Sequence, residues 1–257
     1  MAQPSTIEWT EATWNPTTGC TKISPGCKNC YAERFAERWR GTKGHPYEQG
    51  FDLKLWDDRI EIPLHWKKSR IIFVNSMSDL FHKDIPFNFT EKVFETMRKA
   101  HWHTYQVLTK RPERMLEFSK QYGKWSSNVW AGVSVESQQY VHRIDVLRQV
   151  PVETKFLSCE PLLGPLDLKL KSIDWVIVGG ESGPGARDME KEWVTSIQQQ
   201  CKKANVAFFF KQWGGVFKSH TGRKLDGKTY DEMPPIINSK QLVFDSLNCP
   251  PRDPMNQ

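Results

Sequence analysis

Short apolar segments alternate with amphipathic stretches along most of this chain. Segments rich in β-branched and aromatic residues predict strands at 71–75, 104–108, 128–133, 154–158, 173–178 and 206–210. Apolar residues at helical spacing predict helices at about 89–101, 111–121, 137–149 and 190–204. A further strand near 7–13 and a helix at about 30–40 raise the total to roughly seven strands.

This alternation predicts the fold class. Strands that are apolar on both faces are typical of a parallel sheet covered by helices, either doubly wound or closed into a barrel. Roughly seven strands favour an α/β fold with a partial or near-complete (β/α) TIM-type barrel. We expect residues 1–213 to form this barrel and residues 214–257, rich in Gly, Pro, Lys and Asp, to form an irregular C-terminal extension packed on it.

Composition narrows the class of protein. Aromatic residues make up 12% of the 257 residues and charged residues 26%, which is enough for a packed core and a polar surface. The sequence has no apolar run of about 18 residues and no secretory signal at residues 1–9, so we expect a cytoplasmic protein without a membrane segment. The net charge of +6 mildly favours anionic partners such as nucleotides and nucleic acid.

Three cysteines near the amino terminus carry the strongest chemical signal. Cys20, Cys27 and Cys30 have the spacing C-x6-C-x2-C within a segment rich in Gly and Pro. In a reducing compartment, cysteines at irregular spacing are better explained as ligands, reactive groups or buried residues than as disulfides. Three thiolates from one loop suit an iron–sulfur cluster that leaves one iron open. Two alternatives stay open: structural zinc that recruits His45, or buried thiols without a metal.

Polar residues follow the predicted strands, where a barrel collects its functional groups. The candidates at these strand ends are Ser78, Asp79, Lys110, Arg111, Glu136, Glu160, Glu181, Lys211, Gln212 and Trp213. Some have a structural alternative: Asp79 is also suited to capping a turn, and Arg111 to opening a helix before Pro112. Cys159, at the end of the fifth strand run, is either a hydrogen-atom donor or a small buried residue.

Several segments resemble a known family. IEWTEATWNPTTGCTKISPGCKNCYAERFAERW, NSMSDLFH, LTKRPERM, SCEPLLGPL, VIVGGESGPGARDM, KQWGG and LDGKTYDEMP together resemble a phage and bacterial three-Cys-motif family of unknown role, related to radical S-adenosylmethionine (radical SAM) enzymes. The resemblance covers most of residues 5–235. Six residues separate the first two cysteines where radical SAM enzymes commonly have three, and Asn29 occupies the usual aromatic slot, with Tyr31 nearby.

The resemblance implies a cofactor set and roles for the strand-end residues. It implies a 4Fe-4S cluster on the three cysteines, S-adenosylmethionine on the open iron, an external electron donor and cleavage to a 5′-deoxyadenosyl radical. Ser78 and Asp79 would hold the methionine amino group, and Lys110 and Arg111 its carboxylate. The acidic candidates for ribose or substrate are Glu136, Glu160 and Glu181.

The predicted function is therefore a radical enzyme that depends on an iron–sulfur cluster and S-adenosylmethionine. A nucleic acid or nucleotide is the first candidate for its substrate, with Lys211 and Gln212 in the substrate floor and Trp213 as a stacking surface. The alternative function is a zinc-stabilised nucleic-acid-binding protein without catalysis.

Overall fold

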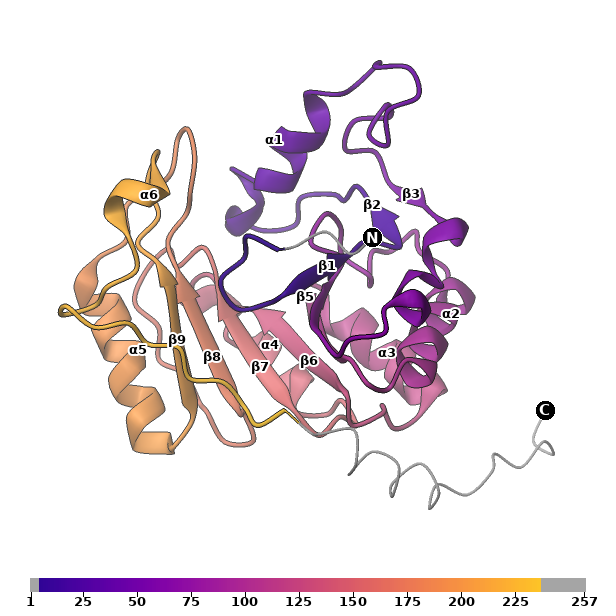
Figure 1. The fold of residues 1–257 in the computed structure, drawn as a ribbon. Helices are drawn as coiled ribbons and strands as arrows, with labels where there is room; N and C mark the ends of the chain where they lie inside the picture. The colour runs from indigo at the N-terminus through magenta and orange to yellow at the C-terminus, as the bar shows by residue number, and fades with distance from the viewer. Residues whose placement is uncertain (1–4, 237–257) are drawn as a thin grey trace.

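Seven parallel strands form the central sheet in a computed structural model that describes residues 5–236 (Figure 1). In spatial order the strands are β1 (Ala12–Trp14), β4 (Ile71–Val74), β5 (Thr104–Thr109), β6 (Val129–Ser134), β7 (Lys155–Cys159), β8 (Trp175–Gly179) and β9 (Ala207–Gln212). Within the described chain β1 and β9 are opposite edges that do not pair, so the sheet is a half-barrel. The α/β partial-barrel prediction is confirmed.

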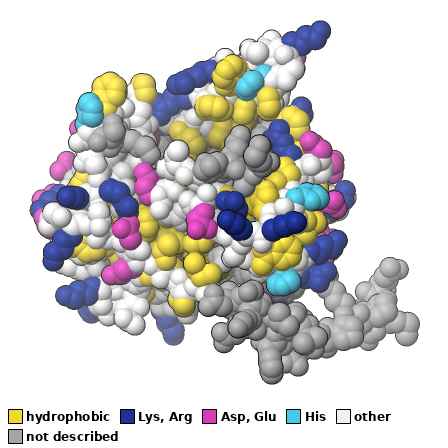
Figure 2. Space-filling view, in the orientation of Figure 1, with side chains coloured by type: hydrophobic (Ala, Val, Ile, Leu, Met, Phe, Trp, Pro, Cys, Tyr) yellow, Lys and Arg dark blue, Asp and Glu magenta, His cyan; other side chains and the backbone are white. Residues whose placement is uncertain are grey.

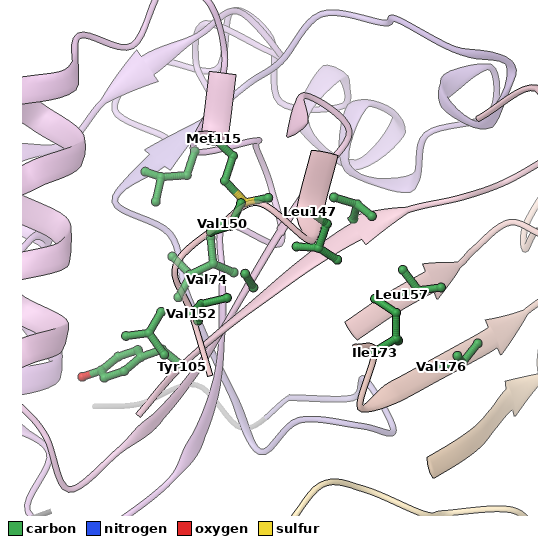
Figure 3. Packing of buried hydrophobic residues seen from close by; sticks show 14 of the residues in the cluster. Val74, Tyr105, Met115, Leu147, Val150, Val152, Leu157, Ile173 and Val176 are labelled. Atoms are coloured by element: carbon green, nitrogen blue, oxygen red, sulfur yellow. The ribbon is translucent and has the colours of Figure 1, made fainter. Parts of the chain in front are cut away.

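Four helices cover the outer face of the half-barrel. They are α2 (Phe87–Lys99), α3 (Pro112–Tyr122), α4 (His142–Leu147) and α5 (Lys191–Ala204). Figure 3 shows Met115 of α3 and Leu147 of α4 in the same core as Val74, Leu157 and Val176 of the strands. Each such buried side chain contributes about 1.5–3 kcal/mol through burial. This core holds the strands in place beneath the site.

A second, aromatic core fills the inner face near the amino ends of the strands. It contains Trp9, Phe73, Trp130, Phe156, Trp175, Ile177 and Phe209. Because side chains alternate along a strand, Phe156 belongs to this inner core while its neighbour Leu157 belongs to the outer core. Gly132 leaves space for the Phe156 ring, since a Cβ atom at Gly132 would lie 2.3 Å from that ring. The aromatic core leaves the carboxyl ends of the strands for polar groups.

The segment after β9 returns along the outer edge of that strand. The Tyr230 carbonyl accepts a hydrogen bond of 2.9 Å from the Phe210 amide, and Phe209 forms an antiparallel bridge with Asp231. A strand edge left open is a template for aggregation, so this pairing protects β9. Before it lies the short helix α6 (Lys218–Thr221). The boundary at residue 213 stays a prediction, and residues 237–257 of the expected extension lie outside the described part.

Three predicted elements differ from the observed ones. The strand expected at 7–13 is shorter and spans only Ala12–Trp14. The chain before it does not continue the strand, because Trp9 turns onto the inner face and packs against Phe73 and Trp175. The expected helix at 137–149 is a 3₁₀ turn at Gln138–Tyr140 followed by the six-residue α4. The expected helix at 30–40 is the seven-residue α1 (Tyr31–Glu37).

Candidate functional site

A cavity lies at the carboxyl ends of the strands, between the half-barrel and the cysteine loop. Eleven of the residues singled out in the sequence line it: Cys20, Cys27, Cys30, Ser78, Asp79, Lys110, Arg111, Glu160, Glu181, Lys211 and Gln212. Residues far apart in the sequence meet here because parallel strands direct all their carboxyl ends to the same side of the sheet.

The cysteine loop belongs to the long insertion between β1 and β4. This insertion contains the small hairpin β2 (Thr17–Thr18) and β3 (Lys54–Leu55), three 3₁₀ turns at Pro25–Cys27, Asp57–Arg59 and Ile62–His65, and α1. Gly19 passes so close to the chain that a Cβ atom there would lie 2.2 Å from the Asp52 carbonyl oxygen, and its φ is +84°. Only glycine fits this position without strain, and it brings Cys20 against the strand ends.

The three thiols are half-buried and differ in their surroundings. The Arg111 guanidinium donates to the Cys20 sulfur at 3.5 Å, and Cys30 is the N-cap of α1. Burial, followed by the Asp79 charge, raises the pKa of Cys20 to about 11. Burial also raises the pKa of Cys30, and the amides of Glu33 and Ala32 oppose this rise. Any metal group that bound Cys20 would therefore have to displace its proton at neutral pH.

This arrangement can be compared with the needs of a metal group. Among residues 5–236, no three His, Cys, Asp or Glu side chains converge closely enough to hold one metal ion. A 4Fe-4S cluster carries each thiolate on a different iron, so its ligands stand further apart than those of one ion. Three cysteines of one loop in the lining of the same cavity, with a cationic donor at Cys20 and helix amides at Cys30, are a donor set that suits such an anionic group.

Asp79 and Arg111 form a buried network beside Cys20. Asp79 accepts hydrogen bonds from the Thr109 hydroxyl at 2.7 Å and from the amides of Phe81 and Lys110 at 3.0 and 3.1 Å. It also pairs with Arg111 at 2.9 Å, and both side chains are about nine-tenths buried. The network engages both carboxylate oxygens, and it ties the end of β5 to the cysteine loop.

Ser78 completes this attachment of the cysteine loop. Its hydroxyl donates to the Gly19 carbonyl at 2.6 Å, and the two residues form a parallel bridge. Ser78 thus holds the backbone immediately before Cys20.

Glu181 closes the opposite side of the cavity. Its carboxylate accepts hydrogen bonds from the Asn29 amide at 2.9 Å and from the Arg187 side chain and backbone. Burial opposes ionisation, but the bonds from Arg187 and Asn29 outweigh it and lower the pKa of Glu181. Glu181 therefore fastens the loop after β8 to the cysteine loop.

Three candidates lie away from the cavity lining. Glu136 is fully buried and pairs with Arg143 at 2.9 Å. Cys159 belongs to the outer core, where burial raises its pKa well above the ordinary value. Trp213 packs against Phe210 and donates to the Lys224 carbonyl at 2.8 Å. These contacts give each of the three residues a structural role.

Several polar groups remain directed at the cavity. The Lys110 side chain makes no hydrogen bond or ion pair among residues 5–236, although its charge acts on Cys30, and Lys211 pairs with Glu160 at 3.0 Å. The Ser158 hydroxyl donates to Glu160 at 3.2 Å, and Ser134 also lines the wall. These side chains give the strand ends both charges and hydroxyl groups.

Two aromatic residues near the cysteines have defined positions. Tyr31 lines the cavity and donates its hydroxyl to the Ser76 carbonyl at 2.5 Å. His45, the candidate fourth zinc ligand, stacks on Trp39 with ring centres 4.1 Å apart, and its Nδ1 accepts from the Tyr47 amide.

Asn29, Arg143 and Arg187 were missed in the sequence. Asn29 donates to Glu181, which is 152 residues away in the sequence, and only the folded chain brings these two residues together. Arg143 and Arg187 pair with Glu136 and Glu181, which are 7 and 6 residues away.

No helix in the described range is long and apolar enough to span a bilayer.

Comparisons with known proteins place the chain in a family. A search of curated proteins found no match. Among solved structures, spore photoproduct lyase complexed with dinucleoside spore photoproduct matches with a TM-score of 0.47 and 12% identity over 79% of this chain. A double mutant of that lyase with bound AdoMet and dinucleoside spore photoproduct gives 0.46 and 13% over the same 79%. This chain spans 64% of the lyase's length. A family model matches residues 4–234, and the chain belongs to the family described as protein of unknown function DUF5131.

Proposed function

We propose that this protein is a radical enzyme that uses a 4Fe-4S cluster and S-adenosylmethionine and acts on a nucleic acid or nucleotide. One observation carries the proposal: three cysteines of a single loop line one wall of a cavity whose other wall is the carboxyl ends of parallel strands. Cys20, Cys27 and Cys30 would hold the cluster, with Arg111 and the amino end of α1 stabilising its negative charge. An external donor would supply the electron with which the cluster cleaves S-adenosylmethionine.

Lys110 is the best-supported contact for the methionine carboxylate. Asp79 and Cys20 already engage the Arg111 side chain, whereas Lys110 lines the cavity and makes no hydrogen bond or ion pair in the described part of the chain. An ammonium group in a half-buried cavity attracts a carboxylate strongly. We expect Lys110→Met to raise the concentration of S-adenosylmethionine needed for half-maximal cleavage about tenfold or more, whereas exposed Lys120→Met leaves it unchanged.

The remaining wall would orient the substrate or the ribose. Glu160 and Lys211 form an ion pair with limited solvent access, and Ser158 donates to the same carboxylate. A pair of this kind offers an acceptor and a donor at fixed positions, which suits hydroxyl and base groups. Asp79 and Glu181 would act on the cysteine loop rather than on a ligand, because protein donors occupy their oxygens.

Anaerobic reconstitution tests the proposal. Protein supplied with iron and sulfide should bind about four irons per chain, absorb visible light as a brown species, and form 5′-deoxyadenosine with dithionite and S-adenosylmethionine. Cys30→Ala should lose both the chromophore and the product, and Cys201→Ala, buried in α5, should keep both. Stoichiometric zinc without iron or sulfide would favour the zinc-stabilised binding protein, and a cluster that never cleaves the cofactor would exclude the radical chemistry.

A further inference from the structure

Helix α1 buries its small residues and exposes its large ones. Ala32 and Ala36 are 4% and 0% exposed and pack against Phe51 and Met77. On another side of the helix, Tyr31 and Phe35 are 53% and 44% exposed. A helix that packs only for stability shows the opposite distribution, with large apolar side chains inward. The exposed rings of α1 are therefore available to contact a ligand.

These rings belong to a larger aromatic surface. We use this name for Tyr31, Phe35, Trp39, His45 and Tyr47. Phe35 meets Tyr47 edge to face at 5.5 Å between ring centres, and Trp39 stacks on His45 at an interplanar angle of 15°. Figure 2 shows hydrophobic side chains and a histidine gathered on the upper part of the molecule, where Figure 1 places α1. Contacts between the rings fix their orientation, so little side-chain entropy is lost when a planar ligand stacks on them.

The charge around the aromatic surface is positive. Residues 20–52 carry six Lys or Arg side chains against three Glu and one Asp, and that aspartate, Asp52, pairs with Arg40. Lys28, Arg38 and Lys43 are exposed and have no side-chain partner among residues 5–236. Proteins bind single-stranded nucleic acid without sequence preference through two elements: aromatic rings that stack on bases, and cations that contact phosphates. An acidic protein partner would contact the cations but not the rings, and a purely apolar partner would contact the rings but not the cations.

The aromatic surface also leads into the cavity. Tyr31 belongs to both, because its ring lines the cavity and its hydroxyl is fixed on the Ser76 carbonyl. Along α1, from Tyr31 to Glu37, the chain rises roughly 9 Å at 1.5 Å per residue, which is the length of about three stacked bases.

We propose that the aromatic surface binds a single-stranded segment of nucleic acid and delivers one base past Tyr31 into the cavity. This inference rests on the proposed function and narrows its substrate from a free nucleotide to a polymer. Bases stack on the rings of Phe35 and Trp39, while Arg38 and Lys43 contact phosphates. A free mononucleotide reaches only the cavity end of this surface.

Fluorescence anisotropy with labelled fifteen-residue oligothymidylate tests the inference on the full-length, cluster-loaded protein. Phe35→Ala with Trp39→Ala should weaken binding about tenfold or more, and Phe35→Tyr with Trp39→Phe should retain it. Arg38→Glu with Lys43→Glu should weaken binding and lower its salt dependence. Lys120→Glu with Lys203→Glu makes the same change in net charge on α3 and α5 and should have little effect. Circular dichroism establishes that each variant is folded.

The outcomes separate this inference from the proposed function. A protein that holds its cluster and cleaves S-adenosylmethionine, yet binds the oligonucleotide no more tightly than thymidine monophosphate, overturns the inference alone. Binding that is equal in the alanine double variant and the wild type also overturns it. A dimer that is broken by the same double variant, without oligonucleotide binding, would assign the aromatic surface to a second copy of the chain.

Discussion

Asp79→Asn separates a structural role of this carboxylate from a role in cofactor binding. Each Asp79 oxygen accepts two protein donors, so an Asn amide in either orientation sets its NH₂ group against two N–H or O–H donors. The substitution also removes the charge that faces Arg111, and both side chains are about nine-tenths buried. Breaking one partner of a buried pair costs about 3–5 kcal/mol.

We therefore expect the cluster-free Asp79→Asn protein to lose about 3 kcal/mol or more of its unfolding free energy. Its melting temperature should fall by roughly 6–12 °C, at about 2–4 °C per kcal/mol for a chain of this size. Urea titration followed by tryptophan fluorescence, under reducing and metal-free conditions, measures the first quantity. Asp84→Asn is the matched control, because the Asp84 side chain is 62% exposed in the same loop. Unchanged stability of Asp79→Asn, with loss of S-adenosylmethionine binding, would refute the structural role.

Two further predictions concern the packing and the pH response. Gly132→Ala should destabilise the protein by about 1–3 kcal/mol because its Cβ atom would overlap the Phe156 ring, whereas Gly164→Ala, with no atom within 4 Å, should leave the melting temperature nearly unchanged. Burial lowers the pKa of His103 and of His82. Below about pH 6.5 these histidines therefore bind protons in the unfolded chain more readily than in the folded chain, which lowers the free energy of unfolding. Urea midpoints should therefore drop between pH 7.5 and 5.5, and His103→Gln should reduce the drop; an equal drop in the variant would contradict the assignment.

The strands could be predicted from the sequence because a buried strand is recognised from its own residues alone. A buried strand such as β8, with the sequence WVIVG, is apolar at every position, and it is identifiable without its neighbours. The helix α5 was predicted within one residue at its start because its apolar positions repeat at helical spacing. Trp9 shows the limit of such patterns: it looks like a strand residue, but it packs between Phe73 and Trp175 from distant strands.

The partners of charged groups could not be predicted, because local sequence patterns do not report contacts between distant segments. No residue near Glu181 in the sequence indicates that Asn29, 152 residues away, donates a hydrogen bond to it. A carboxylate at a strand end is equally suited to a ligand and to an internal cation until the fold is known. Of the three predicted acidic candidates, Glu136 and Glu181 are paired with arginines, and Glu160 is paired with a cavity lysine.

The alternation of side chains along each strand also predicts which candidate residues face the cavity and which face the outer core. In β7 and just after it, inward positions are Phe156, Ser158 and Glu160, so Cys159 has to point into the outer core. Phe156 points inward, and side chains alternate along a strand. Glu160 therefore faces the cavity, whereas Cys159, its neighbour in the sequence, packs in the outer core. A hydrogen-atom donor has to touch the substrate, and Cys159 is on the wrong face of the sheet to do so. The inward carboxylate and its lysine partner are the groups through which this strand would act on a substrate.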